Sequence, residues 1–427
     1  MGFLRLLGAV LVLALPAPSV HATPGPGGAE IMLGQAEAPM NGPWKFRLGD
    51  DPRWASPQWD DRGWETVDLT PAPGAHDPDV GLPGYVPGWM KRGHLDAYGY
   101  AWYRLHVRWH TPEASQLVIV GPTYVEDAYE VYWNGKRLGG VGDFSKGTPR
   151  AIATRPALLR VPVRGASGEA VVAIRVYLAP GMPRSGDAGG IHIAPILAEK
   201  TAGEARYVAQ WAMTFVGYVV DAVEPFLFVL LGLYALSVGR FSPADRFHVA
   251  LAVALVLTAA LRANQVLFNW GGFEDLRQYT IAKYAILEPA IFLAWAHVWD
   301  RWTPHTAKLM TRLALVLAIL MAVAGLVGEA AAPLRLATRL GFLIPLGSAA
   351  FRILREGSMC PLALSALLLV CIGLFAEELS LIGIQGIWFP FGVGVSRTQY
   401  AYALLIPALA LACHIRSRPR STDRLVE

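Results

Sequence analysis

Hydrophobic and polar positions follow two different patterns along this 427-residue chain. Between about Gly42 and Ile196, short stretches alternate apolar with polar residues; the clearest are 105–110, 116–120, 129–133 and 171–177. Between about Tyr207 and Arg416, long apolar stretches follow one another with few charges. A period of two is typical of half-buried strands, whereas long apolar stretches indicate membrane spans. The chain is therefore expected to combine a β domain with a membrane domain.

The alternating half predicts an antiparallel jelly-roll β-sandwich. Its stretches are rich in β-branched and aromatic residues and are separated by Gly and Pro clusters. Asn134-Gly135 directly follows one stretch and predicts a two-residue hairpin, because both residues tolerate positive φ. The three cysteines all lie in the other half, so this domain has no disulfide available.

The first residues predict a secretory signal peptide. Arg5 is followed by an apolar run over 6–15 and by Val20-His21-Ala22, a small-x-small cleavage site. The apolar run is shorter than the roughly 20 residues that a span needs. Cleavage is therefore expected after Ala22, with the β domain outside the cytoplasm.

The apolar half predicts a seven-helix transmembrane bundle. The expected spans are 208–238, 247–268, 279–299, 307–327, 334–353, 361–384 and 397–415. Loops on one side carry more Arg and Lys, among them Arg301, Arg352 and Arg355, which assigns that side and the carboxyl terminus to the cytoplasm. The whole chain divides into 1–22 signal peptide, 23–41 flexible lead-in, 42–199 β-sandwich, 200–206 linker, 207–416 bundle and 417–427 basic tail.

Four motifs of the β half resemble the galactose-binding-like jelly roll that opens family 2 glycosidases. They are Gly42-Pro-Trp-Lys-Phe46, Trp59-Asp-Asp-Arg-Gly-Trp64 with the residues up to Leu69, Ala101-Trp-Tyr-Arg104 and Val131-Tyr-Trp-Asn-Gly-Lys136. The catalytic barrel of those glycosidases has no place in this chain, because membrane spans begin where it would follow. The resemblance therefore implies a fold and carbohydrate binding, and no enzymatic activity is expected.

The order of the two domains resembles bacterial seven-transmembrane receptors with diverse intracellular signalling modules. The segments 189–195 and 221–225 are compatible with the junction between sandwich and bundle in that family. The resemblance implies a multi-pass protein of the bacterial inner membrane with a periplasmic amino-terminal domain. An output module is expected to be absent, since about eleven residues follow the last span. A receptor of this kind would need a separately encoded cytoplasmic signalling protein.

Function is thus expected to be that of a membrane sensor, whose extracytoplasmic domain binds a small molecule or glycan. Two alternatives stay open, a transporter or transport accessory and a membrane-bound enzyme. Sugar sites combine aromatic faces with a few polar groups. Candidates in expected loops or strand ends are Trp89, His94, Tyr98, Tyr100, Tyr124, Glu126, Asp127 and Arg184. Trp44, Trp59, Trp64 and Trp133 are expected to be structural.

Ionisable residues inside the expected spans form a second candidate site. They cost about 2.5–3.5 kcal/mol each at mid-bilayer on insertion scales, so they normally face the bundle interior and pair. The predicted polar cluster consists of Asp221, Glu224, Arg262, Gln265, Lys283, Glu288, Arg339, Glu377 and Glu378. Two interpretations stay open, a structural network of ion pairs that fixes helix order and a polar pocket that binds a ligand or moves with the β domain.

Other partners are restricted by charge and composition. The net charge of +4 is small and the Arg residues are scattered, so nucleic acid is not an expected partner. No Cys/His spacing resembles a zinc site, and neither a metal nor a cofactor is expected. With 54% hydrophobic and only 16% charged residues, the expected surroundings are membrane lipid.

Overall fold

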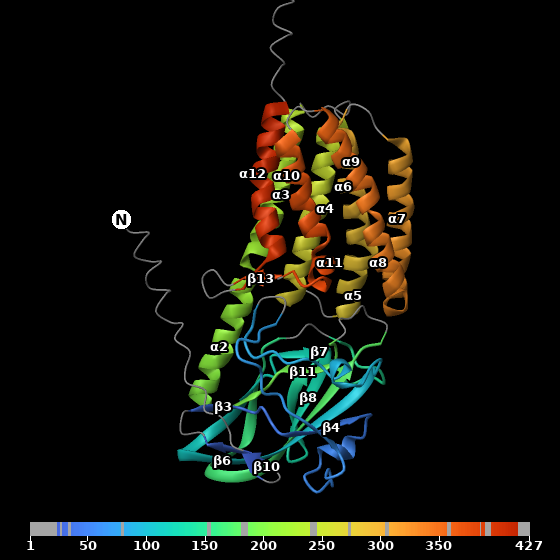
Figure 1. Ribbon diagram of the computed structural model, residues 1–427. Helices are drawn as coiled ribbons and strands as arrows, with labels where there is room; N and C mark the ends of the chain where they lie inside the picture. The colour runs from blue at the N-terminus through green and yellow to red at the C-terminus, as the bar shows by residue number, and fades with distance from the viewer. Residues whose placement is uncertain are drawn as a thin grey trace, which may run out of the picture.

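The computed structural model describes residues 24–25, 28–32, 36–77, 81–151, 155–180, 187–239, 246–271, 275–303, 307–356, 360–384, 386–388 and 394–416. A curled β domain is followed by a bundle of helices, and the bundle stands end-on above the β domain (Figure 1). The predicted signal peptide and the basic tail lie outside the described residues.

The β domain is built around a ten-stranded sheet with mainly antiparallel neighbours. The strands of the domain are β1 (Pro24–Gly25), β2 (Gly28–Met32), β3 (Glu37–Pro39), β4 (Trp44–Leu48), β5 (Glu65–Val67), β6 (Gly99–Val120), β7 (Tyr124–Glu126), β8 (Ala128–Trp133), β9 (Lys136–Val141), β10 (Leu158–Leu178), β11 (Gly190–Ile193) and β12 (Ile196–Glu199), with short helices η1 (Pro52–Ala55) and η2 (Met90–Arg92). The long strands β6 and β10 pair with each other. The other edge of β6 is shared by β4, β2 and β12. A curled, mainly antiparallel sheet is therefore confirmed, and the finer prediction of a jelly roll is not.

Alternation along β6 places its side chains as expected. Tyr103, Leu105 and Val107 point into the main core, whereas Trp102 joins a second apolar cluster on the opposite face. The predicted hairpin is confirmed, because Trp133 pairs with Lys136 across Asn134 and Gly135, whose φ angles are 47° and 81°.

Two segments differ from the sequence interpretation. The lead-in 23–41, expected to be flexible, contributes β1, β2 and β3 to the sheet. Its backbone continues the open edges of β6 and β12, which satisfies hydrogen-bonding groups on both sides. The expected linker 200–206 is helical, because it forms the first turns of α2 (Lys200–Gly217), which packs on β6 and β12.

The remaining helices form the bundle. They are α3 (Val219–Val238), α4 (Arg246–Asn269), α5 (Leu276–Thr280), the π-helix η3 (Ile281–Leu287), α6 (Glu288–Trp302), α7 (Lys308–Val327), η4 (Glu329–Ala331), α8 (Ala332–Gly341), α9 (Leu343–Glu356), α10 (Cys360–Leu374), α11 (Ala376–Leu381) and α12 (Arg397–Arg416); the short strands β13 (Ile387–Trp388) and β14 (Val395–Ser396) precede α12. Within the described residues, six helical stretches are long and apolar enough to cross a membrane.

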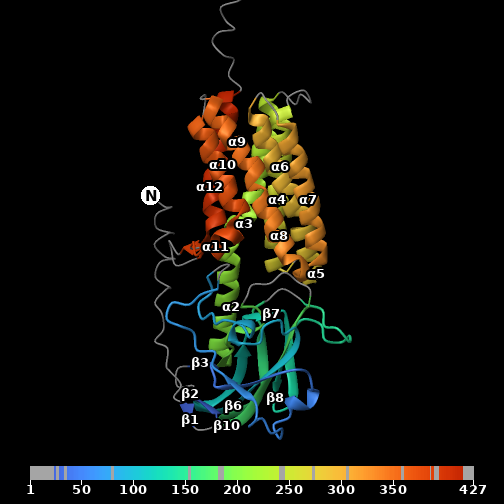
Figure 2. The same ribbon diagram turned by 45° about the vertical axis from the view of Figure 1, so that its right-hand side comes forward.

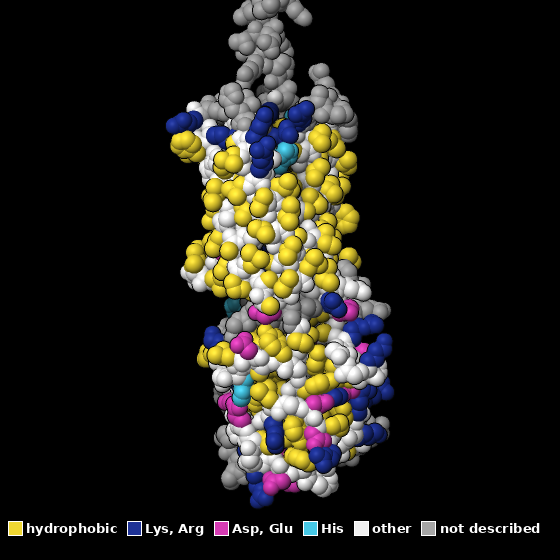
Figure 3. Space-filling view, turned by 90° about the vertical axis from the view of Figure 1, so that its right-hand side faces the viewer, with side chains coloured by type: hydrophobic (Ala, Val, Ile, Leu, Met, Phe, Trp, Pro, Cys, Tyr) yellow, Lys and Arg dark blue, Asp and Glu magenta, His cyan; other side chains and the backbone are white. Residues whose placement is uncertain are grey.

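The expected count of seven spans is not confirmed. The sixth expected span, 361–384, divides into α10 and the short α11, with a break at Phe375. Its apolar part, Pro361–Leu374, is shorter than the other candidate spans, and the acidic residues Glu377 and Glu378 begin three residues after it. A belt of hydrophobic side chains nevertheless surrounds the bundle, with Lys and Arg gathered at the end away from the β domain (Figure 3). This surface is compatible with a multi-pass membrane protein.

Candidate functional site: a charged cavity at the domain-proximal end of the bundle

A cavity of about 280 Å³ lies among the helices at the end of the bundle that faces the β domain. Its walls come from α4, η3, α6, α8, α10, α11 and the start of α12. The labels of α5, α11 and β13 mark this end in Figure 1 and show it directly above the β domain. Charged side chains line the cavity, namely Arg262, Lys283, Glu288, Arg339, Glu377 and Arg397.

The first group of ion pairs connects α3 with α4. The Arg262 guanidinium on α4 binds both Asp221 and Glu224 of α3, with 2.7 Å between its Nε and Glu224 Oε2. Asp221 and Glu224 lie one turn apart and are buried, so one arginine reaches both carboxylates. Gln399 of α12 donates a hydrogen bond of 2.8 Å to Asp221 and a second one to the carbonyl of Gly217. Three helices therefore meet at this group.

The second group connects α8 with α6 and α11. Arg339 is buried and donates to Glu288 at 2.7 Å, to both carboxylate oxygens of Glu378, and to the carbonyl of Leu374. Lys283 lies 3.6 Å from Glu377 on the same wall of the cavity. The fork of a guanidinium suits several acceptors at once, which explains why an arginine joins these elements.

All nine residues of the predicted polar cluster come together around this cavity. Arg262, Gln265, Lys283, Glu288, Arg339 and Glu377 line it. Asp221, Glu224 and Glu378 pair with the lining arginines. The geometry is compatible with both interpretations, a structural network and a ligand pocket, because the ion pairs surround a space large enough for a small polar group.

Sequence reasoning missed Arg397, the first residue of α12. Its guanidinium lines the cavity and donates to the carbonyls of Ile384 and Ala376 and to the Ser380 hydroxyl. An arginine at a span border is easily taken for a loop charge. After the break at Phe375, α11 supplies two of these acceptors, the carbonyl of Ala376 and the hydroxyl of Ser380.

One helical path connects the sheet of the β domain with the first ion-pair group. α2 packs on the sheet through Tyr207, against a small cluster that includes Val118 and Ala198. Arg206 of α2 also pairs with Glu37 of β3. After a break at Tyr218, α3 continues into the bundle and carries Asp221 (Figure 2). The chain therefore runs directly from the sheet through α2 and α3 to the first ion-pair group.

A second contact joins the two domains directly. The Leu276 amide of α5 donates a hydrogen bond of 3.0 Å to the Ala151 carbonyl of the β domain. Ala151, Leu276 and Tyr279 are buried together, and Phe268 and Ala179 pack against them. Tyr279 also donates to Gln265, a residue that lines the cavity.

Most of the predicted ligand residues of the β domain have structural contacts. Trp89 is buried in the core and donates to the carbonyl of Ala97, while Tyr98 packs on that core. His94 pairs with Glu65 at 2.7 Å. Tyr100 packs against Tyr177 and Arg175, and Asp127 accepts from the amide of Ala179. Arg184 lies outside the described residues.

Tyr124 and Glu126 of β7 belong to a cluster of aromatic and acidic side chains, which also includes His192 of β11 and the loop residues Tyr85 and Asp187. Tyr85 stacks on His192 at 5.0 Å between ring centroids, and Tyr124 meets the same ring edge-on. Tyr85 donates a hydrogen bond of 2.8 Å to Asp187. Burial and this hydrogen bond raise the pKa of Tyr85, so its hydroxyl remains a donor. The cluster lies at the end of the β domain that faces the bundle (Figures 1 and 2).

No protein-family model and no curated protein matches the chain. Solved structures of family 2 glycosidases are similar to part of it. A β-glucuronidase from Bacteroides uniformis matches at 19% identity over 38% of this chain and 17% of that chain, with a TM-score of 0.28. A family 2 member from Bacteroides cellulosilyticus matches at 17% identity over 38% of this chain and 20% of that chain, with a TM-score of 0.27. The chain thus spans about a fifth of the length of these structures.

The comparisons correct one expectation. The sequence interpretation expected no enzymatic activity, but the solved structures named above are glycoside hydrolases, so this expectation is not upheld. Catalytic activity is unproven, because the coverage and the TM-scores are low. Within the described residues, no group of three or more His, Cys, Asp or Glu side chains could hold a metal ion.

Proposed function

We propose that this chain is a membrane sensor, whose β domain binds an extracytoplasmic ligand and whose bundle passes the change to a separate cytoplasmic protein. In this proposal the chain crosses the bacterial inner membrane seven times, with α10 and α11 as a broken sixth span and the basic end of the bundle in the cytoplasm. The observation that carries it is the path from the sheet through α2 and α3 to Arg262.

The proposed ligand site is formed by Tyr85 and Tyr124, which are half-buried and pack on the buried ring of His192. Stacked rings beside the carboxylates of Glu126 and Asp187 are the kind of surface on which sugars bind. The sequence resemblance makes a carbohydrate or an envelope fragment the first class of ligand to test. A ligand that prefers one arrangement of the two domains would shift the bundle between two states.

Binding to the full-length protein in lipid nanodiscs tests the ligand site. A panel of glycans and envelope fragments is titrated against wild type, Tyr124→Ala and Tyr85→Phe. We expect Tyr124→Ala to weaken binding by about tenfold or more, because it removes one aromatic face. Tyr132→Phe is the matched control for Tyr85→Phe, since each removes a hydroxyl that donates to a carboxylate. Equal effects of Tyr85→Phe and Tyr132→Phe would contradict this location.

Crosslinking in native membranes, followed by identification of the captured proteins, tests whether the chain binds a cytoplasmic protein. A cytoplasmic signalling protein is the expected partner. A chain that binds no glycan and captures no cytoplasmic protein would refute the sensor.

Transport is the second candidate, and the charged cavity favours it. Its ionisable walls lie among helices that are long and apolar enough to span a membrane. Flux into proteoliposomes that needs no partner and is lost in Glu224→Gln would replace the sensor with a transporter.

A further inference from the structure

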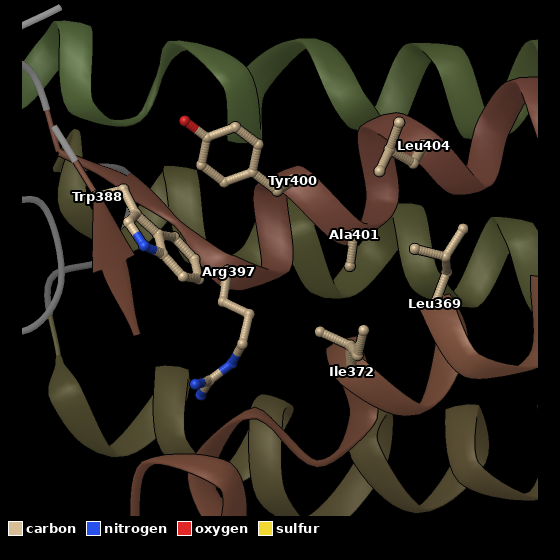
Figure 4. A pocket seen from close by; sticks show the side chains of 7 residues that line it. All are labelled: Leu369, Ile372, Trp388, Arg397, Tyr400, Ala401 and Leu404. Atoms are coloured by element: carbon tan, nitrogen blue, oxygen red, sulfur yellow. The ribbon is translucent and has the colours of Figure 1, made fainter. Parts of the chain in front are cut away.

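An apolar groove on the outside of the bundle adjoins the charged cavity. It has a volume of about 690 Å³ and lies between α10 and α12, on the bundle side of the β13–β14 pair. Leu369, Ile372 and Leu404 line it, and Trp388 and Tyr400 lie at one end (Figure 4). Leu404 is 60% exposed, so the groove opens on the hydrophobic belt.

Arg397 lines both the groove and the cavity. It is the first residue of a 20-residue helix, which is about 30 Å long and matches the hydrocarbon core of a bilayer. A helix of this length that spans the bilayer places its first residue, Arg397, at the border of the hydrocarbon core, next to the headgroup phosphates. Trp388 and Tyr400 beside it are the residue types that favour this interface.

We propose that this combined site holds one phospholipid of the surrounding membrane. One acyl chain lies in the groove, the phosphate lies at Arg397, and the polar head enters the cavity. The groove, Arg397 and the cavity follow one another in the same order as the acyl chains, the phosphate and the polar head of a phospholipid. The planar fork of a guanidinium matches phosphate oxygens.

The polarity of the two spaces supports this assignment. The groove is lined mainly by aliphatic and aromatic side chains, whereas the cavity carries Gln265, Ser380, Ser396 and Thr398 beside its charged groups. Three of the lining cations, Arg262, Lys283 and Arg339, pair with acidic side chains. Arg397 donates to two carbonyls and a hydroxyl, which are neutral acceptors, so the phosphate is assigned to Arg397. This inference is independent of the sensor proposal, because it concerns the bundle alone.

Photocrosslinking of the full-length protein in liposomes tests the proposal. The probe is phosphatidylglycerol with a photoreactive group in one acyl chain, and the labelled peptides are mapped. We expect labels to concentrate on α10 and α12 around Leu369 and Leu404. Labels spread evenly over these helices and the outer face of α7 would indicate bulk lipid only and would overturn the proposal.

Two comparisons make the test specific. Leu404→Trp fills the groove and should lower the labelling of α10 by about tenfold. Leu411→Trp is the matched control, since Leu411 is 50% exposed, lies about two turns further along α12 and does not line the groove. A photoreactive diacylglycerol, which lacks the phosphate, should label about tenfold less than phosphatidylglycerol. Equal labelling by the two lipids, or equal effects of the two variants, would overturn the assignment.

Discussion

Arg339→Gln tests how strongly the second ion-pair group holds the bundle together. Arg339 is 3% exposed and binds Glu288, Glu378 and a backbone carbonyl. Glutamine keeps a polar side chain of moderate length but removes the charge. Glu288, which is also buried, would then lose the guanidinium that neutralises it.

The expected cost follows from the unpaired carboxylates. Removing one partner of a buried ion pair typically destabilises a protein by about 3–5 kcal/mol, because the remaining charge stays away from water. Lys283 pairs with Glu377 on the same wall and cannot replace Arg339 without leaving that partner. We therefore expect a loss in the free energy of unfolding at the upper part of this range.

The assay is reversible unfolding in mixed detergent micelles, followed by far-ultraviolet circular dichroism. The triple variant Arg339→Gln, Glu288→Gln, Glu378→Gln should recover about half of the loss or more, since no buried charge is left unpaired. Arg312→Gln on α7 is the control, because this side chain is exposed, and it should change the stability by less than about 0.5 kcal/mol. A loss below about 1 kcal/mol for Arg339→Gln, or a triple variant as unstable as the single one, would refute the reasoning.

Three further predictions concern the β domain and its junction. A Cβ at Gly203 would overlap the Val118 side chain, so Gly203→Leu should separate α2 from β6. It should lower the free energy of unfolding in the same assay by about 1–3 kcal/mol, and Gly203→Ala should lower it by less. Asn134→Val should lower the free energy of unfolding by about 1–2 kcal/mol, because a β-branched residue disfavours the positive φ of this hairpin. An unchanged melting temperature would contradict this prediction. Burial opposes ionisation of Asp61, but hydrogen bonds from its histidine and arginine partners outweigh it and lower the pKa below 3.8. The stabilisation by this carboxylate is therefore present above pH 3.8 and is lost as the pH falls through the lowered pKa, so the stability difference between wild type and Asp61→Asn should shrink on acidification below pH 3.8.

The sequence by itself determined that a β half precedes an apolar half, and it predicted the charged cluster apart from Arg397. Alternation with a period of two requires a sheet with one buried face, and Asn134-Gly135 permits a hairpin that most residues do not. Long apolar stretches predict helices in a membrane, and the ionisable residues inside them must find partners there. These features are local, so periodicity and residue type were sufficient to predict them.

Only the tertiary structure decided which residues meet and where cavities remain. The partners Arg339 and Glu378 are 39 positions apart, and the choice of Glu288 as the other partner depends on how α6, α8 and α11 pack. The sixth expected span breaks at Phe375, and α11 beyond the break supplies acceptors for Arg397, an arrangement that no hydropathy pattern contains. The path from the sheet to Asp221 likewise exists because α2 packs on β6, a contact between segments about 80 residues apart. Such contacts depend on packing in three dimensions, whereas the periodicity of a sequence records only which side of each element is buried.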